Sequence, residues 1–163
     1  MVRAATAADA TDTARVWRAA WLDGHRGHVP ATLLAVRDPQ YFADRAAALT
    51  ESTLLASDAG GRIVGVAILT ADELVQLAVD SIARRQGVGA ALLQAAEARI
   101  AANHGQAWLA VVPGNIRARD FYAQHGWRDT GEMTYQAPSA SGPVPVPVRR
   151  YVKSLILSGR TAP

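Results

Sequence analysis

Two glycines, Gly87 and Gly89, follow the arginines Arg84 and Arg85, and this spacing indicates a site for phosphate. A glycine has no Cβ, so a phosphate oxygen can come close to the backbone at both positions. The apolar stripe that follows predicts a long helix, whose first N–H groups have no helical partner and lie at the positive end of the helix dipole. The segment therefore predicts a pyrophosphate-binding turn, with an arginine adding charge.

Two better-known glycine motifs do not fit this segment. A P-loop has four residues between its glycines and continues with Gly-Lys-Ser/Thr, which is absent here. A dinucleotide-binding fingerprint has a third glycine three residues further on, where this chain has Leu92. Taken alone, the turn also has a purely structural interpretation, in which the glycines only allow tight packing at the start of a helix.

The elements that must position this turn follow from hydrophobic periodicity and turn residues. Strands are expected at 2–5, 53–57, 62–70, 73–79, 107–112, 130–136 and 146–156. Helices are expected at 9–22, at 32–49 with a break near Asp38-Pro39, at 87–103 and at 115–125. This order predicts an α/β (α+β) fold, with a mixed, mostly antiparallel central sheet and helices on both faces. At 163 residues, one domain over 1–163 is expected.

Composition excludes several classes of function. The chain has no cysteine, so a disulfide framework, a Cys-ligated zinc and a thiol nucleophile are excluded. The net charge is +3, and the only tight groups of basic residues are separate arginine pairs. This is too little clustered positive charge for binding a nucleic acid. No signal peptide or membrane-length apolar run is evident, so we expect a cytoplasmic protein that binds neither membrane nor nucleic acid. His25 and His28 lack a third ligand type, so no metal site is expected.

Two blocks of the sequence together resemble the GNAT superfamily of acetyl-CoA-dependent N-acetyltransferases. Arg84-x-x-Gly87-x-Gly89 matches the family's pyrophosphate loop and follows Leu74-x-x-Leu77-x-Val79, which is similar to the family's fourth strand. The second block is Leu109-x-Val111, then Asn115-x-x-Ala118-x-x-Phe121-Tyr122, then Gly126-Trp127. It is similar to the family's fifth strand, its asparagine-led helix and its closing Gly-aromatic pair. One departure is Ser81, where the family often has proline.

The resemblance covers nearly the whole chain and implies splayed fourth and fifth strands, with acetyl-CoA as the acyl donor. It implies that Leu77, Ala78 and Val79 offer backbone groups to the pantetheine arm. The residues that it implies around the pyrophosphate are Arg84, Arg85, Gln86, Gly87, Val88, Gly89 and Ala90. The residues that it implies beside the pantetheine are Asn115, which would donate or accept a hydrogen bond, Ala118 and Phe121.

Amide formation from a thioester needs a neutral amine, a stabilised oxyanion and a protonated leaving thiolate. Because no cysteine is available, direct attack in a ternary complex is expected. Tyr122 is the candidate general acid, and the alternative is a core tyrosine that packs on Phe121. Glu73 is the candidate base, since it precedes Gly87 at the spacing found in the histone-acetylating branch of the superfamily. The alternative for Glu73 is a solvated carboxylate beside Asp72.

By position, the loop 24–30 resembles the stretch that lines the acceptor site in this superfamily. Trp21, Asp23, His25 and His28 are therefore candidates for shaping an acceptor pocket, which the Pro-rich segment 137–147 would face. The expected acceptor is a small primary amine. The alternatives are a protein N-terminus or lysine, and a CoA-binding sensor without turnover. Members of the superfamily are often dimers, so a homodimer is compatible with the sequence.

Overall fold

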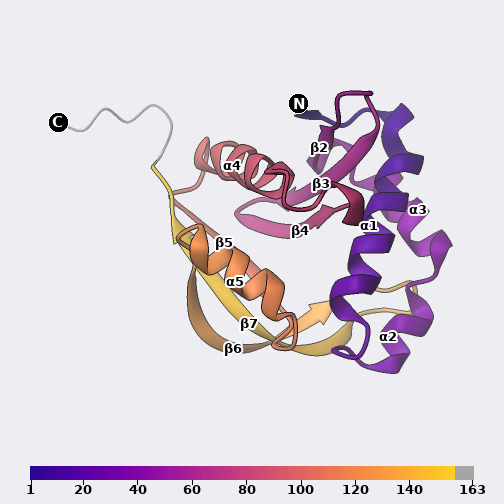
Figure 1. Ribbon diagram of the computed structural model, residues 1–163. Helices are drawn as coiled ribbons and strands as arrows, with labels where there is room; N and C mark the ends of the chain where they lie inside the picture. The colour runs from indigo at the N-terminus through magenta and orange to yellow at the C-terminus, as the bar shows by residue number, and fades with distance from the viewer. Residues whose placement is uncertain (157–163) are drawn as a thin grey trace.

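One mixed sheet organises the computed structural model, which describes residues 1–156 (Figure 1). Its strand order is β1-β2-β3-β4-β5-β7-β6, and every neighbouring pair is antiparallel except β4 and β5. The strands are β1 (Val2–Ala4), β2 (Thr53–Ser57), β3 (Ile63–Thr70), β4 (Glu73–Val79), β5 (Gln106–Val111), β6 (Arg128–Ala137) and β7 (Val144–Ser154). The predicted mixed, mostly antiparallel sheet is confirmed.

Helices cover both faces of this sheet, as the sequence predicts (Figure 1). The helices are α1 (Ala10–His25), α2 (Ala31–Val36), α3 (Pro39–Ala48), α4 (Val88–Ala101) and α5 (Ile116–Gln124), with short 3-10 turns η1 (Ala7–Asp9), η2 (Thr50–Ser52) and η3 (Ser81–Ala83). One buried cluster joins α1 and α3 to the sheet through residues such as Trp17 and Phe42. A second cluster joins α4 and α5 to the opposite face through residues such as Leu92 and Leu109. The sheet therefore separates two apolar cores.

The first helix is longer than the sequence suggests, because it runs on through Gly24 to His25. We expected it to end near Leu22, since glycine is a poor helix former. Gly24 is buried, and a Cβ there would lie 2.8 Å from Nδ2 of Asn115. The close approach of the loop before α5 therefore explains a glycine inside the last turn of α1.

A β-bulge interrupts β4 at Val75. On β3, Ile68 faces Gln76 while the next residue, Leu69, faces Leu74, so Val75 has no residue opposite it. An extra residue reverses the alternation of faces along a strand. For that reason Leu74 and Leu77, three positions apart, both pack in the core under α4. Val75 and Gln76 both line a cavity on the opposite face, on the side of α1 and α3.

The parallel strands β4 and β5 pair at a single position, Glu73 with Trp108, and then diverge. Beyond this point, the β5-facing edge of β4 has no strand ladder within residues 1–156. Two prolines, Pro145 and Pro147, lie where β7 extends past the end of β5 and pairs with β6 alone. The two prolines are two positions apart on β7, so both lack an N–H group on the same edge of the strand. On the edge away from β6, this absence removes no hydrogen bond from the β6–β7 pairing. The predicted splay of the fourth and fifth strands is confirmed.

The packing of α4 on β3 generates a prediction for Gly65. A Cβ at Gly65 would lie 2.6 Å from Cδ1 of Leu92 and 2.9 Å from Cγ1 of Val88, so Gly65→Ala should overpack this interface. We expect the free energy of unfolding to fall by about 1–3 kcal/mol, measured by urea denaturation. Gly105→Ala is the matched control, because a Cβ there meets nothing within 4 Å, and its stability should be unchanged or slightly raised. Equal stability of the two variants would contradict this account of the packing.

Candidate active site

The loop before α4 has the backbone shape of an anion site. Gly87 is the N-cap of α4 in the left-handed region, with φ 79°, and Arg85 also has a positive φ, at 60°. The first hydrogen bond of the helix runs from the Ala91 N–H to the Gly87 carbonyl. The N–H groups of Val88, Gly89 and Ala90 precede this bond and have no backbone acceptor within residues 1–156. These donors, at the positive end of the helix dipole, suit a pyrophosphate.

Arg84 is held at this loop by Asp23 of α1. One carboxylate oxygen of Asp23 accepts from Nη2 of Arg84 at 2.6 Å and from Nη2 of Arg117 at 2.8 Å. The Arg117 hydrogen bond, followed by that of Arg84, holds the pKa of Asp23 below its ordinary value against the opposing effect of desolvation. Arg85 and Gln86 are exposed at the same turn. Asp23 thus joins α1 to both predicted cofactor-binding blocks.

Between α4 and α5, three of the predicted cofactor-binding residues come together. A Cβ at Gly89 would lie 3.4 Å from the Phe121 ring and 3.7 Å from Cγ2 of Val79. Leu77 and Ala118 are partly buried in the same core, and Ala78 is buried on the opposite face. Because β4 lacks a partner strand here, its backbone edge is available to a ligand, as the resemblance implies.

The side chain of Asn115 caps α5. Its Oδ1 accepts from the Ala118 N–H at 3.2 Å, while its Nδ2 lies against Gly24. The neighbouring Gly114 is covered by the imidazole of His28, and a Cβ at Gly114 would overlap that ring. The C-terminal end of α1 and the loop after it are therefore packed onto the loop between β5 and α5.

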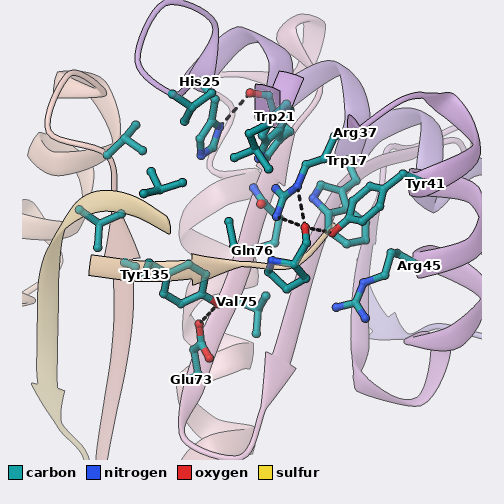
Figure 2. A pocket seen from close by; sticks show the side chains of 18 residues that line it. Trp17, Trp21, His25, Arg37, Tyr41, Arg45, Glu73, Val75, Gln76 and Tyr135 are labelled. Atoms are coloured by element: carbon teal, nitrogen blue, oxygen red, sulfur yellow. Dashed lines mark hydrogen bonds between the residues drawn. The ribbon is translucent and has the colours of Figure 1, made fainter. Parts of the chain in front are cut away.

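A cavity of about 80 Å³ lies on the other face of the sheet, where β4 and β5 diverge (Figure 2). From α1 it receives Trp17, Trp21 and His25, each one turn after the last. The lining from α3 and the residues before it is Arg37, Tyr41 and Arg45. The lining from the sheet includes Glu73, Val75, Gln76, Ala110, Tyr135 and Val148, and Val112 lines it just after β5. Both diverging strands contribute, so the cavity reaches the place where they separate.

Glu73 and Tyr135 form a hydrogen-bonded pair at one side of this cavity. The Tyr135 hydroxyl donates to Oε1 of Glu73 at 2.7 Å (Figure 2). Desolvation by burial raises the pKa of the Glu73 carboxyl, the Tyr135 hydrogen bond lowers it, and the charge of Asp72 raises it further. The net effect moves the pKa of Glu73 upward, which brings it closer to that of a general base at neutral pH. Burial also raises the pKa of Tyr135, so the phenol keeps its proton.

Arg37 lies on the other side of the cavity (Figure 2). Its Nε and Nη2 donate to the carbonyl of Pro138 at 3.2 and 3.0 Å, and the Tyr41 hydroxyl donates to the same oxygen at 3.0 Å. The guanidinium also lies over the rings of Trp21 and Tyr41, 4.8 and 5.1 Å from their centres. Burial lowers the pKa of Arg37, which still leaves it a cation at neutral pH.

His25 is a neutral side chain of this cavity. Burial lowers its pKa to about 4, although its hydrogen bond to the Trp21 carbonyl opposes the shift. Since Nδ1 is 2.8 Å from that carbonyl, Nδ1 carries the proton in the neutral ring. Nε2 is then left as an acceptor. His25 also stacks on Trp21, with ring centres 4.8 Å apart.

Tyr122 is a residue of α5 whose side chain packs in the core and is only 8% exposed. Its ring contacts those of Phe121, Trp127 and Tyr151, with ring centres 5.4, 6.0 and 6.3 Å apart. Burial raises the pKa of the Tyr122 phenol, so it stays protonated through neutral pH. Both the packing and a proton-donating role are compatible with this position.

Of the residues that the sequence suggests for the acceptor pocket, the structure brings Trp21 and His25 into the cavity. Among the described residues, Asp23 and His28 do not line it. Sequence reasoning missed several polar and aromatic lining residues: Trp17, Arg37, Tyr41, Arg45, Gln76 and Tyr135. Two local signals could have marked shared faces: Tyr41 and Arg45 are four apart on α3, and Trp17 is four before Trp21 on α1.

Comparison with known proteins identifies the family of the chain. Residues 22–139 match the Acetyltransferase (GNAT) domain family. The fold is similar to that of a GCN5-related N-acetyltransferase from Rhodopseudomonas palustris (TM-score 0.74, 23% identity, 95% of each chain covered). It is also similar to a phosphinothricin acetyltransferase from Sinorhizobium meliloti, solved with acetyl-CoA (TM-score 0.70, 18% identity, 100% of this chain and 92% of the other).

A third similar structure is the PaiA N-acetyltransferase from Thermoplasma acidophilum, solved with coenzyme A (TM-score 0.72, 15% identity, 94% of this chain and 98% of the other). No curated protein matches the sequence. Among residues 1–156, no helix is both long and apolar enough to cross a bilayer. The same residues contain no group of three His, Cys, Asp or Glu side chains arranged to hold a metal ion.

The exposed arginine of the loop before α4 gives a prediction for the binding of coenzyme A. Arg85→Glu should raise the Kd for coenzyme A roughly 10-fold or more, because a charge-assisted phosphate contact contributes about 1.5–3 kcal/mol. The measurement is isothermal titration calorimetry. Arg128→Glu, at an exposed position at the start of β6, is the control with the same charge change. If both variants bind coenzyme A as the unmodified protein does, the loop does not hold the pyrophosphate.

Proposed function

Since the chain belongs to the GNAT acetyltransferase family, whose acyl donor is acetyl-CoA, we propose that it acetylates the primary amine of a small molecule. The observation that carries this proposal is the cavity where β4 and β5 diverge, with the Glu73–Tyr135 pair in its wall. A donor bound at the α4 loop would lie on one face of the sheet. An acceptor in the cavity would approach from the other face, through the divergence of the two strands.

The small size of the cavity supports a small acceptor over a protein segment. A volume of about 80 Å³ holds several water molecules, or a side-chain-sized ligand. The Pro138 carbonyl, bound by Arg37 and Tyr41, fixes the end of β6 against α3. This contact limits how far a ligand could extend beyond the cavity on that side.

The proposed base is Glu73. A carboxylate with a raised pKa can take a proton from an ammonium group, directly or through water, and leave the amine neutral for attack. The Tyr135 hydroxyl orients the carboxylate through its hydrogen bond. The amine nitrogen then forms a bond to the thioester carbonyl carbon, and the tetrahedral intermediate collapses with cleavage of the C–S bond.

The proposed acid is Tyr122. The departing thiolate of coenzyme A needs a proton or a hydrogen bond, and a buried phenol that keeps its proton at neutral pH can supply it. Tyr122 lies two turns after the cap residue Asn115 on α5, the helix next to the α4 loop. Because the chain has no cysteine, the acetyl group passes directly from donor to acceptor in a ternary complex.

Turnover across an amine panel tests the proposed function and the role of Tyr122 together. Thiol release from acetyl-CoA should depend on a primary amine. Tyr122→Phe, which keeps the packing of the ring, should lower kcat by about 10²-fold or more. The Kd for coenzyme A should stay unchanged in this variant. Binding of coenzyme A without turnover on any amine would instead favour a non-catalytic sensor, and an unchanged kcat would remove the acid role.

The pH dependence tests Glu73 as the base. With one acceptor throughout, kcat/KM should fall as the pH drops through the raised pKa of Glu73, because protonation removes the base. Tyr135→Phe removes the hydrogen bond that lowers this pKa, so the acid limb should move to higher pH. Asp72→Asn removes the charge that raises it, so the limb should move to lower pH.

Glu73→Gln should abolish this acid limb and lower the rate by about 10²–10⁴-fold. Both neighbouring variants keep Glu73 and change only its surroundings, so their opposite shifts separate a titrating base from a general loss of folding. A profile that is the same in all four proteins would show that Glu73 is not the base.

A further inference from the structure

The cavity contains a half-buried cation, Arg37, whose partners are all neutral. Arg37 donates to the Pro138 carbonyl and lies over two aromatic rings, and within residues 1–156 it forms no ion pair with a carboxylate. A guanidinium has five N–H donors, and the Pro138 carbonyl accepts one from Nε and one from Nη2. Burying a charge without an opposite charge is unfavourable. The guanidinium of Arg37 would therefore be stabilised by an anionic ligand.

Two other residues that line the same cavity each carry a donor without an acceptor. Trp17 is 3% exposed, and its Nε1 is buried without a hydrogen-bond partner in the described part of the chain. Nε of Arg45 is likewise buried without a partner, and Arg45 forms no ion pair with any carboxylate of residues 1–156. Buried donors are almost always paired in folded proteins. Both residues line the cavity, so a ligand there that carried acceptor atoms would be close to two donors that the fold leaves unpaired.

The positive charges of Arg37 and Arg45 also repel each other. Arg45 is one of the charges that lower the pKa of Arg37, so the guanidiniums lie close enough to repel. The acidic residue of the cavity does not relieve this, because the hydroxyl of Tyr135 is the partner of Glu73, across the cavity from both arginines (Figure 2). A compact anion near Arg37 and Arg45 would pair with both cations and accept from Trp17.

We propose that the acceptor carries a compact oxyanion, a carboxylate or a phosphonate, which binds Arg37, Arg45 and Nε1 of Trp17 while its amine faces Glu73. This inference rests on the proposed function, because it places the amine at the proposed base. Figure 2 shows Glu73 and Tyr135 at one side of the cavity and Arg37, Tyr41 and Arg45 at the other. The predicted substrate class is therefore an amino acid or aminoalkyl acid of small size.

The fixed position of Arg37 suits this role. Pro138 and the Trp21 and Tyr41 rings hold the guanidinium before a ligand arrives, so little conformational entropy is lost on binding. Arg45 projects from α3 one turn after Tyr41 and is half-buried. Because Arg37 also anchors the end of β6, Arg45 is the better position for a variant that keeps the fold.

The experiment compares matched acceptors on the full chain. The probes are α- and ω-amino acids, the corresponding aminoalkylphosphonates, and the amino amides, which keep the amine and lose the negative charge. Binding is followed by tryptophan fluorescence with coenzyme A present and no acetyl donor, and turnover by thiol release from acetyl-CoA. We expect the acids to bind at least about 10-fold more tightly than their amides. Comparing the amino acids with the aminoalkylphosphonates shows which oxyanion fits better.

Variants of Arg45 and Trp17 assign this preference to the cavity. Arg45→Gln should weaken binding of the acids about 10-fold or more and leave the amides unchanged, while Arg45→Lys should retain part of the preference. Trp17→Phe keeps an aromatic ring and removes one donor, so it should weaken the acids by a smaller factor. Arg18→Gln, an exposed change on α1, is the control and should alter neither.

The outcomes separate this inference from the proposed function. Selective binding of acids that Arg45→Gln abolishes, with no thiol release on any amine, supports the anion site and refutes catalysis. Acetylation of amides and acids with equal KM, unaffected by Arg45→Gln, supports catalysis and overturns the anion site. Failure of all the acids to bind, or equal weakening of acids and amides by Arg45→Gln, also overturns it.

Discussion

The single pairing of β4 with β5 is the constraint on which both sites depend. Parallel strands that stayed paired would close the sheet and separate its two faces completely. Here the pairing stops after Glu73 and Trp108. The bulge at Val75 turns two successive residues of β4 toward the cavity. Pro145 and Pro147 lie where β7 continues beyond β5. Within residues 1–156, this part of β7 pairs with β6 alone. The end of the β4–β5 pairing leaves backbone N–H and C=O groups on one edge of β4 without a strand partner, and a ligand could supply the missing hydrogen bonds.

The two faces have different electrostatic characters. At the α4 loop, Arg84 and Arg117 share the one carboxylate of Asp23, so positive charge is in excess but exposed to solvent. A pyrophosphate could pair with this excess at little desolvation cost. In the cavity, the half-buried positive charge of Arg37 lies against neutral groups, and the negative charge of Glu73 lies on the opposite side. Such a separation orients a zwitterionic ligand, because reversing it would place like charges together.

Much of the fold was predictable from the sequence, because the helical stripes and turn residues are local signals. The bulge also left a trace, since Leu74 and Leu77 are three apart in a segment that otherwise alternates like a strand. A single sequence cannot decide between a bulge and a helical turn from that spacing alone. The extension of α1 through Gly24 depends on the tertiary contact with Asn115, which no local pattern carries. The family was identified correctly from the two motif blocks, and the roles of their residues stay predictions.

The cavity was hardest to predict, because its chemistry depends on contacts between distant segments. An arginine such as Arg37, between two short helices, is normally expected to be solvated. Its burial follows from the carbonyl of Pro138, 101 positions away, at the end of β6. That carbonyl reaches α3 because the β6–β7 hairpin continues past β5, which the prolines of β7 allow. The contact that holds Arg37 therefore depends on the extension of β7 past β5, whereas the opening of the sheet depends on the divergence of β4 from β5.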